Sequence, residues 1–217
     1  MHSFTEENYL KTIYYLANRQ QGEVSTNALA EMTATKAASV TDMLRKLADK
    51  QLIHYKKYQG VRLTDEGERL ALQIIRRHRL WEVFLVEKLG FGWEAVHAIA
   101  EELEHVRSDE LVSRLDTYLG HPQFDPHGDP IPTPTGQMPP MGYRKLSEAP
   151  IGERVCLMAV LEHSTEFLQH LDHLNLTLGC TVSVQEINAF DKSILVQPDS
   201  RQTVFVSYEV AKNLLVN

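Results

Sequence analysis

Apolar and polar residues alternate in the first fifty positions in a way that predicts three helices. Residues 5–20 and 24–32 repeat apolar side chains at intervals of three and four. After a polar break at 33–35, residues 36–52 repeat the same pattern. Two helices and a third that follows a tight turn are typical of a helix-turn-helix.

The helix ends have suitable capping residues. Thr5 is the candidate N-cap of the first helix, and Ser25 or Thr26 is the candidate for the second. The third helix is expected to bury one face, made of Val40, Met43, Leu44 and Leu47.

A basic hairpin is predicted directly after the third helix. Runs 53–58 and 61–64 favour strands, and Gln59-Gly60 between them favours a tight turn. Such a wing and the exposed face of the third helix suit the DNA backbone and major groove. The candidate DNA contacts are Thr35, Lys36, Ala38, Ser39, Thr41, Arg45 and Lys57. A winged helix used for protein contacts is the alternative.

The composition changes near the middle of the chain. Residues 120–142 contain seven of the nine prolines, which predicts a connector. Beyond it, short runs rich in Val and Ile predict strands at 154–161, 181–187, 193–198 and 203–210. Residues 161–176 predict an amphipathic helix between the first two strands.

Charge is distributed unevenly. The net charge is −7, but residues 1–80 have 13 Lys and Arg against 9 Asp and Glu. A basic head on an acidic remainder favours DNA binding. The hydrophobic content is 43% and no run approaches the ~20 apolar residues of a membrane span. With no leader pattern we expect a cytoplasmic protein without a membrane partner, in which Cys156 and Cys180 stay reduced.

One segment has the residue types of a metal site. His97, Glu101, Glu104 and His105 are spaced to share one face of a continuous helix, with Glu102 beside them. His78 and Glu82 repeat the four-residue spacing upstream. Carboxylates and imidazoles in this pattern predict a site for a divalent cation, the alternative being a solvated acidic face.

These segments resemble a known family, the metal-dependent transcriptional repressors of the diphtheria toxin repressor and manganese transport regulator type. The resemblance covers most of residues 5–132 and is carried by ENYLKTIYYL, SVTDMLRKL, YQGVRLTDEG, RRHRL, LEHVRSDE and PHGDPIP. From about residue 146 the tail, with LTLGCTVSV, is similar to the SH3-like barrel of the longer members and of ferrous-transport accessory proteins.

The resemblance implies a mainly α chain followed by a small all-β barrel. It implies a winged helix-turn-helix DNA-binding domain at 1–72, a helical metal-binding and dimerisation domain at 73–142, and an SH3-like domain at 143–217. Helices within 94–119 would form a homodimer on palindromic double-stranded operator DNA.

The resemblance also implies two ligand sets. The primary set is Asn8, Glu101, Glu104 and His105. The second set is His78, Glu82, His97, Asp125 and His127, with Glu162, His163, Glu166 and His170 as candidates from the barrel. Asn8 departs from the family's Met or Asp, and Lys11 stands where the short manganese regulators place an acid.

An oxygen-rich set favours Mn²⁺, with Fe²⁺ as the alternative. We therefore predict a metal-activated repressor of metal-ion homeostasis that is not an enzyme and has no small-molecule substrate. A winged-helix regulator that responds to an organic ligand or a partner is the alternative. A metallohydrolase is the remote one, because no general base or nucleophile arrangement accompanies the acids.

Overall fold

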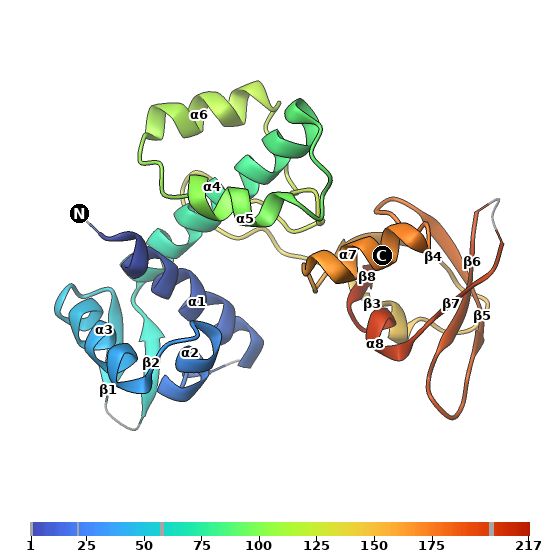
Figure 1. The fold of residues 1–217 in the computed structure, drawn as a ribbon, viewed down its shortest axis with the longest axis horizontal. Coiled ribbons are helices and arrows are strands. Elements are labelled where there is room, and N and C mark those ends of the chain that lie inside the picture. Colours follow the sequence, from blue (N-terminus) through green and yellow to red (C-terminus); the bar gives the residue numbers. More distant parts are fainter. Residues whose placement is uncertain (1, 21, 57–58, 200–201) are drawn as a thin grey trace. The chain divides into compact units, whose positions relative to one another are not determined.

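The computed structural model describes residues 2–20, 22–56, 59–199 and 202–217 (Figure 1). The chain forms two compact units that interleave along the sequence. The first unit consists of Met1–His78, Glu101–Val112 and Ile131–Pro139. The second unit consists of Arg79–Ala100, Ser113–Pro130 and Pro140–Asn217. No helix in the described ranges combines the length and apolar character needed to cross a membrane.

The predicted helix-turn-helix is present in the first unit, as α1 (Phe4–Gln20), α2 (Thr26–Met32) and α3 (Ala37–Asp49). Between α2 and α3 the chain turns through Ala34, whose φ of 49° lies in the left-handed region. Val40, Leu44 and Leu47 of α3 are buried in one core with residues of α1 and the wing.

The N-terminus of α1 differs from the prediction. Thr5 lies inside the helix, so its assignment as the N-cap is wrong. Ser3 and Glu6 instead form a reciprocal capping box, in which each backbone N–H donates to the other's side chain, at 2.7 and 3.2 Å. At α2, Ser25 is the N-cap and accepts from the N–H of Ala28.

The wing consists of β1 (Ile53–Lys56) and β2 (Gly60–Leu63), which pair antiparallel with Ile53 opposite Leu63. Gly60 adopts a φ of 94°, and an added Cβ would lie 3.0 Å from Glu23 Cβ and from the carbonyl oxygen of Val24, which suits the absence of a side chain there. Lys57, the predicted wing contact, lies outside the described residues.

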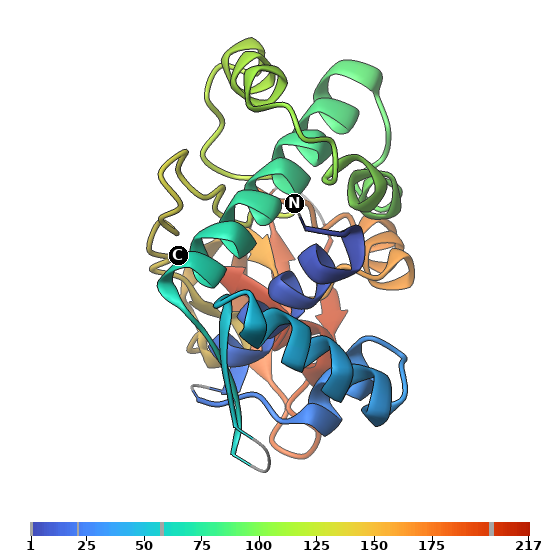
Figure 2. The same ribbon diagram turned by 90° about the vertical axis from the view of Figure 1, so that its left-hand side faces the viewer.

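The middle of the chain is helical. It comprises α4 (Asp65–Leu89), a single long helix in Figure 2, then α5 (Val96–Leu103) and α6 (Asp109–Tyr118). The expectation that four ligands share one helical face is wrong, because α5 ends at Leu103 and the N–H of Val106 closes a turn on its carbonyl. Glu104 and His105 therefore follow the helix.

The C-terminal part of the second unit is an antiparallel sheet of order β3-β8-β4-β5-β6-β7. Its strands are β3 (Arg144–Lys145), β4 (Arg154–Val160), β5 (Thr181–Ile187), β6 (Ile194–Pro198), β7 (Val204–Val206) and β8 (Leu214–Val216). A 3-10 turn η1 (Leu146–Glu148) follows β3, and the predicted amphipathic helix is α7 (Thr165–His173). The inner faces of the strands and one face of α7 form a single apolar core.

The last predicted strand is only half correct. It ends at Val206, because Ser207 accepts from the N–H of Val210 and begins the short helix α8 (Tyr208–Ala211). β3 and β8 were not predicted. The connector contacts β4 closely, since the N–H of Val160 donates to the carbonyl of His127 at 3.0 Å.

Candidate metal centre

A buried cluster of acids and imidazole lies inside the second unit. Ligand atoms of Glu82, Asp125 and His127 all lie within 4.8 Å of one another, and all three residues are buried. Glu82 comes from α4, whereas Asp125 and His127 come from the connector. The proline-rich connector thus places two of the three groups.

The tautomer of neutral His127 is set by a backbone carbonyl. Its Nε2–H donates to the carbonyl of Trp93 at 2.8 Å. Its Nδ1 is buried without a hydrogen-bond partner among the described residues, and Oε2 of Glu82 lies 3.7 Å from it. With Nε2–H committed to that carbonyl, Nδ1 is the ring nitrogen that can lose its proton and bind a metal, as in histidine ligands whose other ring nitrogen donates to a carbonyl.

The acids of the cluster lie close together in a buried environment, which opposes their simultaneous ionisation. Burial, with Asp129 and Glu82 nearby, raises the pKa of Asp125 to about 7. Burial opposes a charge on His127, but Glu82 and Asp125 raise the pKa of its imidazolium to about 9. Arg79 is the cation nearest to Asp125, with its Nε 3.4 Å from Oδ2. A divalent cation would be stabilised here.

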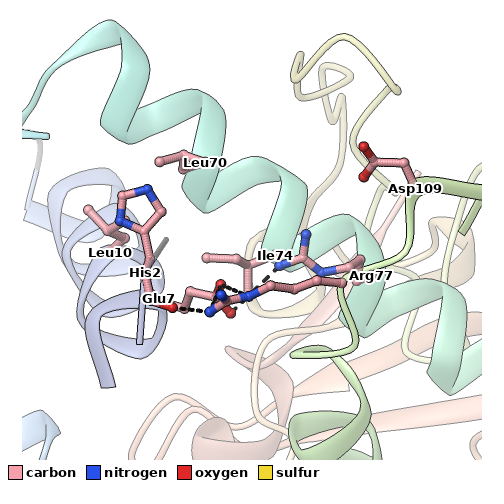
Figure 3. A pocket seen from close by; sticks show the side chains of 8 residues that line it. His2, Glu7, Leu10, Leu70, Ile74, Arg77 and Asp109 are labelled. Carbon is pink, nitrogen blue, oxygen red and sulfur yellow. Dashed lines mark hydrogen bonds and ion pairs between the residues drawn. The ribbon is translucent and has the colours of Figure 1, made fainter. Parts of the chain in front are cut away.

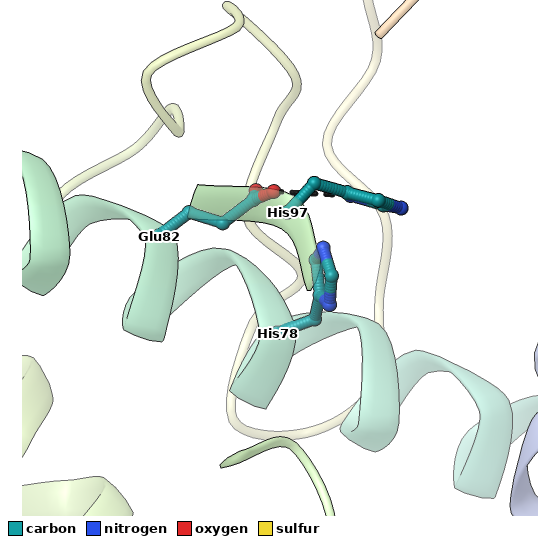
Figure 4. Close-up of side chains that lie close together, drawn as sticks. All are labelled: His78, Glu82 and His97. Atoms are coloured by element: carbon teal, nitrogen blue, oxygen red, sulfur yellow. Dashed lines mark hydrogen bonds and ion pairs between the residues drawn. The ribbon is translucent and has the colours of Figure 1, made fainter. Parts of the chain in front are cut away.

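His97 of α5 extends the cluster. Figure 4 shows its ring beside Glu82, and its Nδ1–H donates to Oε1 of Glu82 at 3.3 Å. His78 lies one turn before Glu82 on α4. His97 is half-exposed, so this side of the cluster faces solvent.

Of the four barrel candidates, one lies at the cluster. The ring of His163 stacks on that of His127 with centroids 4.7 Å apart, and its Nε2 lies 3.8 Å from Asp129. Burial lowers the pKa of His163 and keeps its ring neutral. Glu162 is half-buried, whereas Glu166 and His170 are exposed residues of α7.

Nitrogen and oxygen donors from α4, α5 and the connector therefore gather around Glu82: Asp125 and His127 are buried with it, and half-exposed His97 is hydrogen-bonded to it. The donors include the buried Nδ1 of His127, which has no hydrogen-bond partner within the described part of the chain, and Asp125, whose pKa is raised by burial and neighbouring acids. These residues fit a divalent metal ion.

The predicted primary set is arranged differently, inside the first unit. Glu104 is fully buried and accepts from Lys11 Nζ at 2.7 and 2.8 Å and from His78 Nδ1–H at 2.7 Å. His105 donates from Nδ1 to Glu7 at 2.7 Å. Glu101 is half-exposed, 3.5 Å from Lys11 Nζ.

Asn8 stands apart from the rest of this set. It is exposed on α1, where its backbone carbonyl accepts from the hydroxyl of Thr12. The structure does not bring the four predicted residues into one cage, and their role as ligands stays a prediction.

A pocket of about 310 Å³ lies beside this set, in the first unit (Figure 3). Its lining is mixed, consisting of His2, Glu7, Leu10, Leu70, Ile74, Arg77, Arg107 and Asp109. Glu7 lies 2.9 Å from Arg107 and 3.8 Å from Arg77, and burial lowers the pKa of Arg77. The positive charges of the two arginines are thus partly neutralised by the carboxylate of Glu7.

The predicted DNA-contacting residues lie on and before α3. Thr35, Lys36, Ala38, Ser39 and Arg45 are exposed, and Thr41 is half-buried. Arg45 is paired with Asp42 at 3.4 Å, and both side chains are largely exposed. This pairing explains how an acid is accommodated on a helix face that otherwise suits phosphate.

Sequence reasoning missed several groups at the two sites. Glu7 was not recognised as a partner of His105, although it lies beside Asn8 in the sequence. Lys11, about one turn after Asn8, was not recognised as a partner of Glu104. Asp129, which accepts from Arg79 at 2.9 Å, was also missed. The second acid of the connector run FDPHGDP, four residues after Asp125, was the available signal for Asp129.

A winged helix-turn-helix, a helical segment with a buried carboxylate–imidazole cluster and a small β domain together define a metal-responsive DNA-binding regulator. The chain belongs to the iron-dependent repressor family. The family's N-terminal DNA-binding domain matches residues 1–61, its metal-binding and dimerisation domain matches 64–133, and the FeoA domain matches 144–217. The protein is thus a metal-dependent transcriptional repressor, not an enzyme.

Named relatives agree with this membership. The chain is 34% identical to the iron-dependent repressor IdeR of Mycobacterium bovis, over 76% of this chain and 74% of IdeR. It is 31% identical to the diphtheria toxin repressor of Corynebacterium glutamicum, over 83% of each. A solved manganese-dependent transcriptional repressor in complex with manganese is 37% identical, with a TM-score of 0.86 over 97% of this chain and 98% of that one.

Proposed function

We propose that this repressor is activated by Mn²⁺, with Fe²⁺ as the alternative, through Glu82, His97, Asp125 and His127. The observation that carries the proposal is the buried Nδ1 of His127, which has no hydrogen bond among the described residues and faces Glu82. His78, one turn before Glu82 on α4, and His163 of the barrel are the further candidates.

The donor set supports a hard cation. Carboxylate oxygens and imidazole nitrogens suit Mn²⁺ and Fe²⁺ by geometry and softness, and thiolates are absent from the described cluster. Cys156 and Cys180 lie elsewhere, on and next to strands of the sheet. The relatives named for iron and the solved repressor with manganese support the same two metals.

A bound cation would supply the positive charge that lets these carboxylates stay ionised while buried. The residues themselves provide the linkage. Glu82 belongs to α4, His97 to α5 and His127 to the connector, whose backbone contacts β4. When these side chains bind one metal ion, they hold α4, the start of α5 and the connector in a single arrangement. The metal shifts the conformational equilibrium only as far as it prefers that arrangement over the others.

Binding to operator DNA would follow from the exposed face of α3. Thr35, Lys36, Ala38, Ser39, Thr41 and Arg45, with Lys57 of the wing, are the proposed contacts. The match of residues 64–133 to the family's metal-binding and dimerisation domain supports a homodimer. Two heads related by a two-fold axis would require a palindromic operator.

The test is anaerobic binding of the full chain to a pool of fragments of its source genome at fixed salt. Mn²⁺, Fe²⁺, Zn²⁺ and chelator are compared. We expect a few fragments to be retained with Mn²⁺ and fewer with Fe²⁺. Equal retention in chelator would contradict metal activation and favour a regulator that responds to an organic ligand or a partner.

A further inference from the structure

Lys11 places a cation inside the first unit where two predicted ligands meet. Its Nζ donates to both oxygens of Glu104, at 2.7 and 2.8 Å, and lies 3.5 Å from Glu101. The Lys11 side chain is only 11% exposed and Glu104 is fully buried, so the pair is shielded from solvent. A buried ion pair of this kind is far stronger electrostatically than one on the surface.

Both oxygens of Glu104 are already committed. Besides Lys11, Oε2 accepts from His78 Nδ1–H at 2.7 Å. Burial opposes ionisation of Glu104, but His78 and Lys11 lower its pKa, so the carboxylate is charged and fully compensated. A divalent ion at this carboxylate would have to displace the ammonium.

The side chains around Glu104 do not offer a metal ion a replacement for the two carboxylate oxygens that Lys11 occupies. Asn8 is exposed on α1. His105 donates from Nδ1 to Glu7, its ring stacks on Phe4 with centroids 4.5 Å apart, and its Nε2 lies 3.9 Å from Oε1 of Glu104. The Glu101 side chain is half-exposed and lies 3.5 Å from Lys11 Nζ. While the Lys11 ammonium holds both oxygens of Glu104, the residues at this position do not fit a metal ion.

We propose that the Lys11 ammonium is a built-in cation that stands in place of a metal at Glu104. It joins α1 to the segment after α5 without any added ion. The chain then takes up one divalent ion, at the Glu82–Asp125–His127 cluster, rather than two. The number of bound ions, one, rests on the proposed function. The inference that Lys11 closes the Glu104 position to a metal ion does not.

If Lys11 keeps a metal ion away from Glu104, replacing Lys11 should open this position to a metal ion. Removing the ammonium leaves Glu104 buried, with His78 Nδ1–H donating to it and His105 Nε2 3.9 Å away. A divalent ion can then compensate the carboxylates of Glu104 and Glu101. Lys11→Met keeps the length and apolar contacts of the side chain while it deletes the charge.

The test measures Mn²⁺ per full-length chain by native mass spectrometry and by calorimetric titration. The variants are Glu104→Gln, Glu82→Gln and Lys11→Met, with the exposed Glu102→Gln as the control. We expect one ion in wild type, in Glu102→Gln and in Glu104→Gln, none in Glu82→Gln, and two in Lys11→Met.

Two ions in wild type, with one lost in Glu104→Gln, would overturn the proposal. So would one ion in a folded Lys11→Met. If Lys11→Met does not fold, the comparison of wild type with Glu104→Gln still decides. No ion in wild type but one in Lys11→Met would support closure by Lys11 while contradicting the proposed metal cluster.

Discussion

Nδ1 of His127 lies 3.7 Å from Oε2 of Glu82, and both side chains are almost fully buried. No hydrogen bond joins the two atoms, although a carboxylate and an imidazole would normally form one if nothing else were meant to lie between them. This gap distinguishes the second-unit cluster from the first-unit set, where Lys11 and Glu104 are in direct contact.

Metal affinity is predicted to rise with pH. Asp125 and His127, with pKa values of about 7 and about 9, hold protons that must leave as the ion binds. Affinity for Mn²⁺ should therefore increase from about pH 6 to about pH 8, with proton release on binding. Calorimetry in two buffers of different ionisation enthalpy measures that release. An affinity independent of pH would contradict the assignment of these two ligands.

The Lys11–Glu104 pair is predicted to be strongly coupled. Lys11→Met or Glu104→Gln alone should lower the free energy of unfolding by about 3–5 kcal/mol for the full loss of one buried charge, with the neutral Gln toward the lower end. The double variant should be less destabilised than the sum of the two. Urea unfolding in chelator measures the cycle. Additive losses would mean that the pair makes no net interaction.

Glu6 is predicted to make the head sensitive to acid. Burial opposes its charge, but hydrogen bonds from Lys50, Ser3 and Lys46 lower the pKa of Glu6 to about 2. Its folded pKa is depressed, so its contribution to stability is present above about pH 4.5 and is lost as pH falls toward about 2.

Glu6→Gln isolates this charge, because Gln preserves the capping box with Ser3. Glu6→Gln should destabilise the chain at pH 7, and the difference from wild type should shrink as pH falls toward 2. Thermal unfolding at several pH values measures it. A difference that stays constant with pH would exclude an electrostatic origin.

Gly128 is predicted to hold the connector against the sheet. Its φ is 85°, and an added Cβ would lie 2.1 Å from the carbonyl oxygen of Met158. Gly128→Ala should therefore lower both thermal stability and Mn²⁺ affinity. Gly120→Ala is the matched control, with a φ of 76° and no atom within 4 Å of the added Cβ. It should cost only about 1 kcal/mol of backbone strain. Equal effects in both would mean that the contact with Met158 is unimportant.

Arg45 is predicted to contact the phosphate backbone. Arg45→Ala should weaken DNA binding on all sequences and reduce the salt slope by about 1 per head. Lys212→Ala, at a cation paired with Glu209 in the barrel domain, is the control and should leave the slope unchanged. Fluorescence anisotropy across a range of salt measures both. A loss confined to one sequence would mean that Arg45 contacts a base.

Local signals were sufficient for the head and most of the sheet. The helices and the wing follow from apolar spacing and Gln59-Gly60, since each element is stabilised by near neighbours. The capping box of Ser3 and Glu6 was visible in the sequence but was assigned to Thr5 instead. β3 and β8 are two and three residues long, too short for a period to be recognised.

The site was predictable only in part. Helical spacing found Glu82 and His97 as well as Glu104 and His105, but spacing alone does not show where α5 ends. The contact of Lys11 with Glu104 joins residues 93 positions apart, so it depends on tertiary structure. Resemblance to the family supplied Asp125 and His127, which no local period indicates.

The most direct test of a metal-activated repressor controlled by the Glu82 cluster is Mn²⁺ titration of operator binding, measured by anisotropy at fixed salt. The wild type and the Glu102→Gln control should gain affinity at the same Mn²⁺ concentration, whereas Glu82→Gln should gain none, even at about 10-fold more Mn²⁺. A Glu82→Gln response identical to wild type, or tight wild-type binding in chelator, would contradict the account.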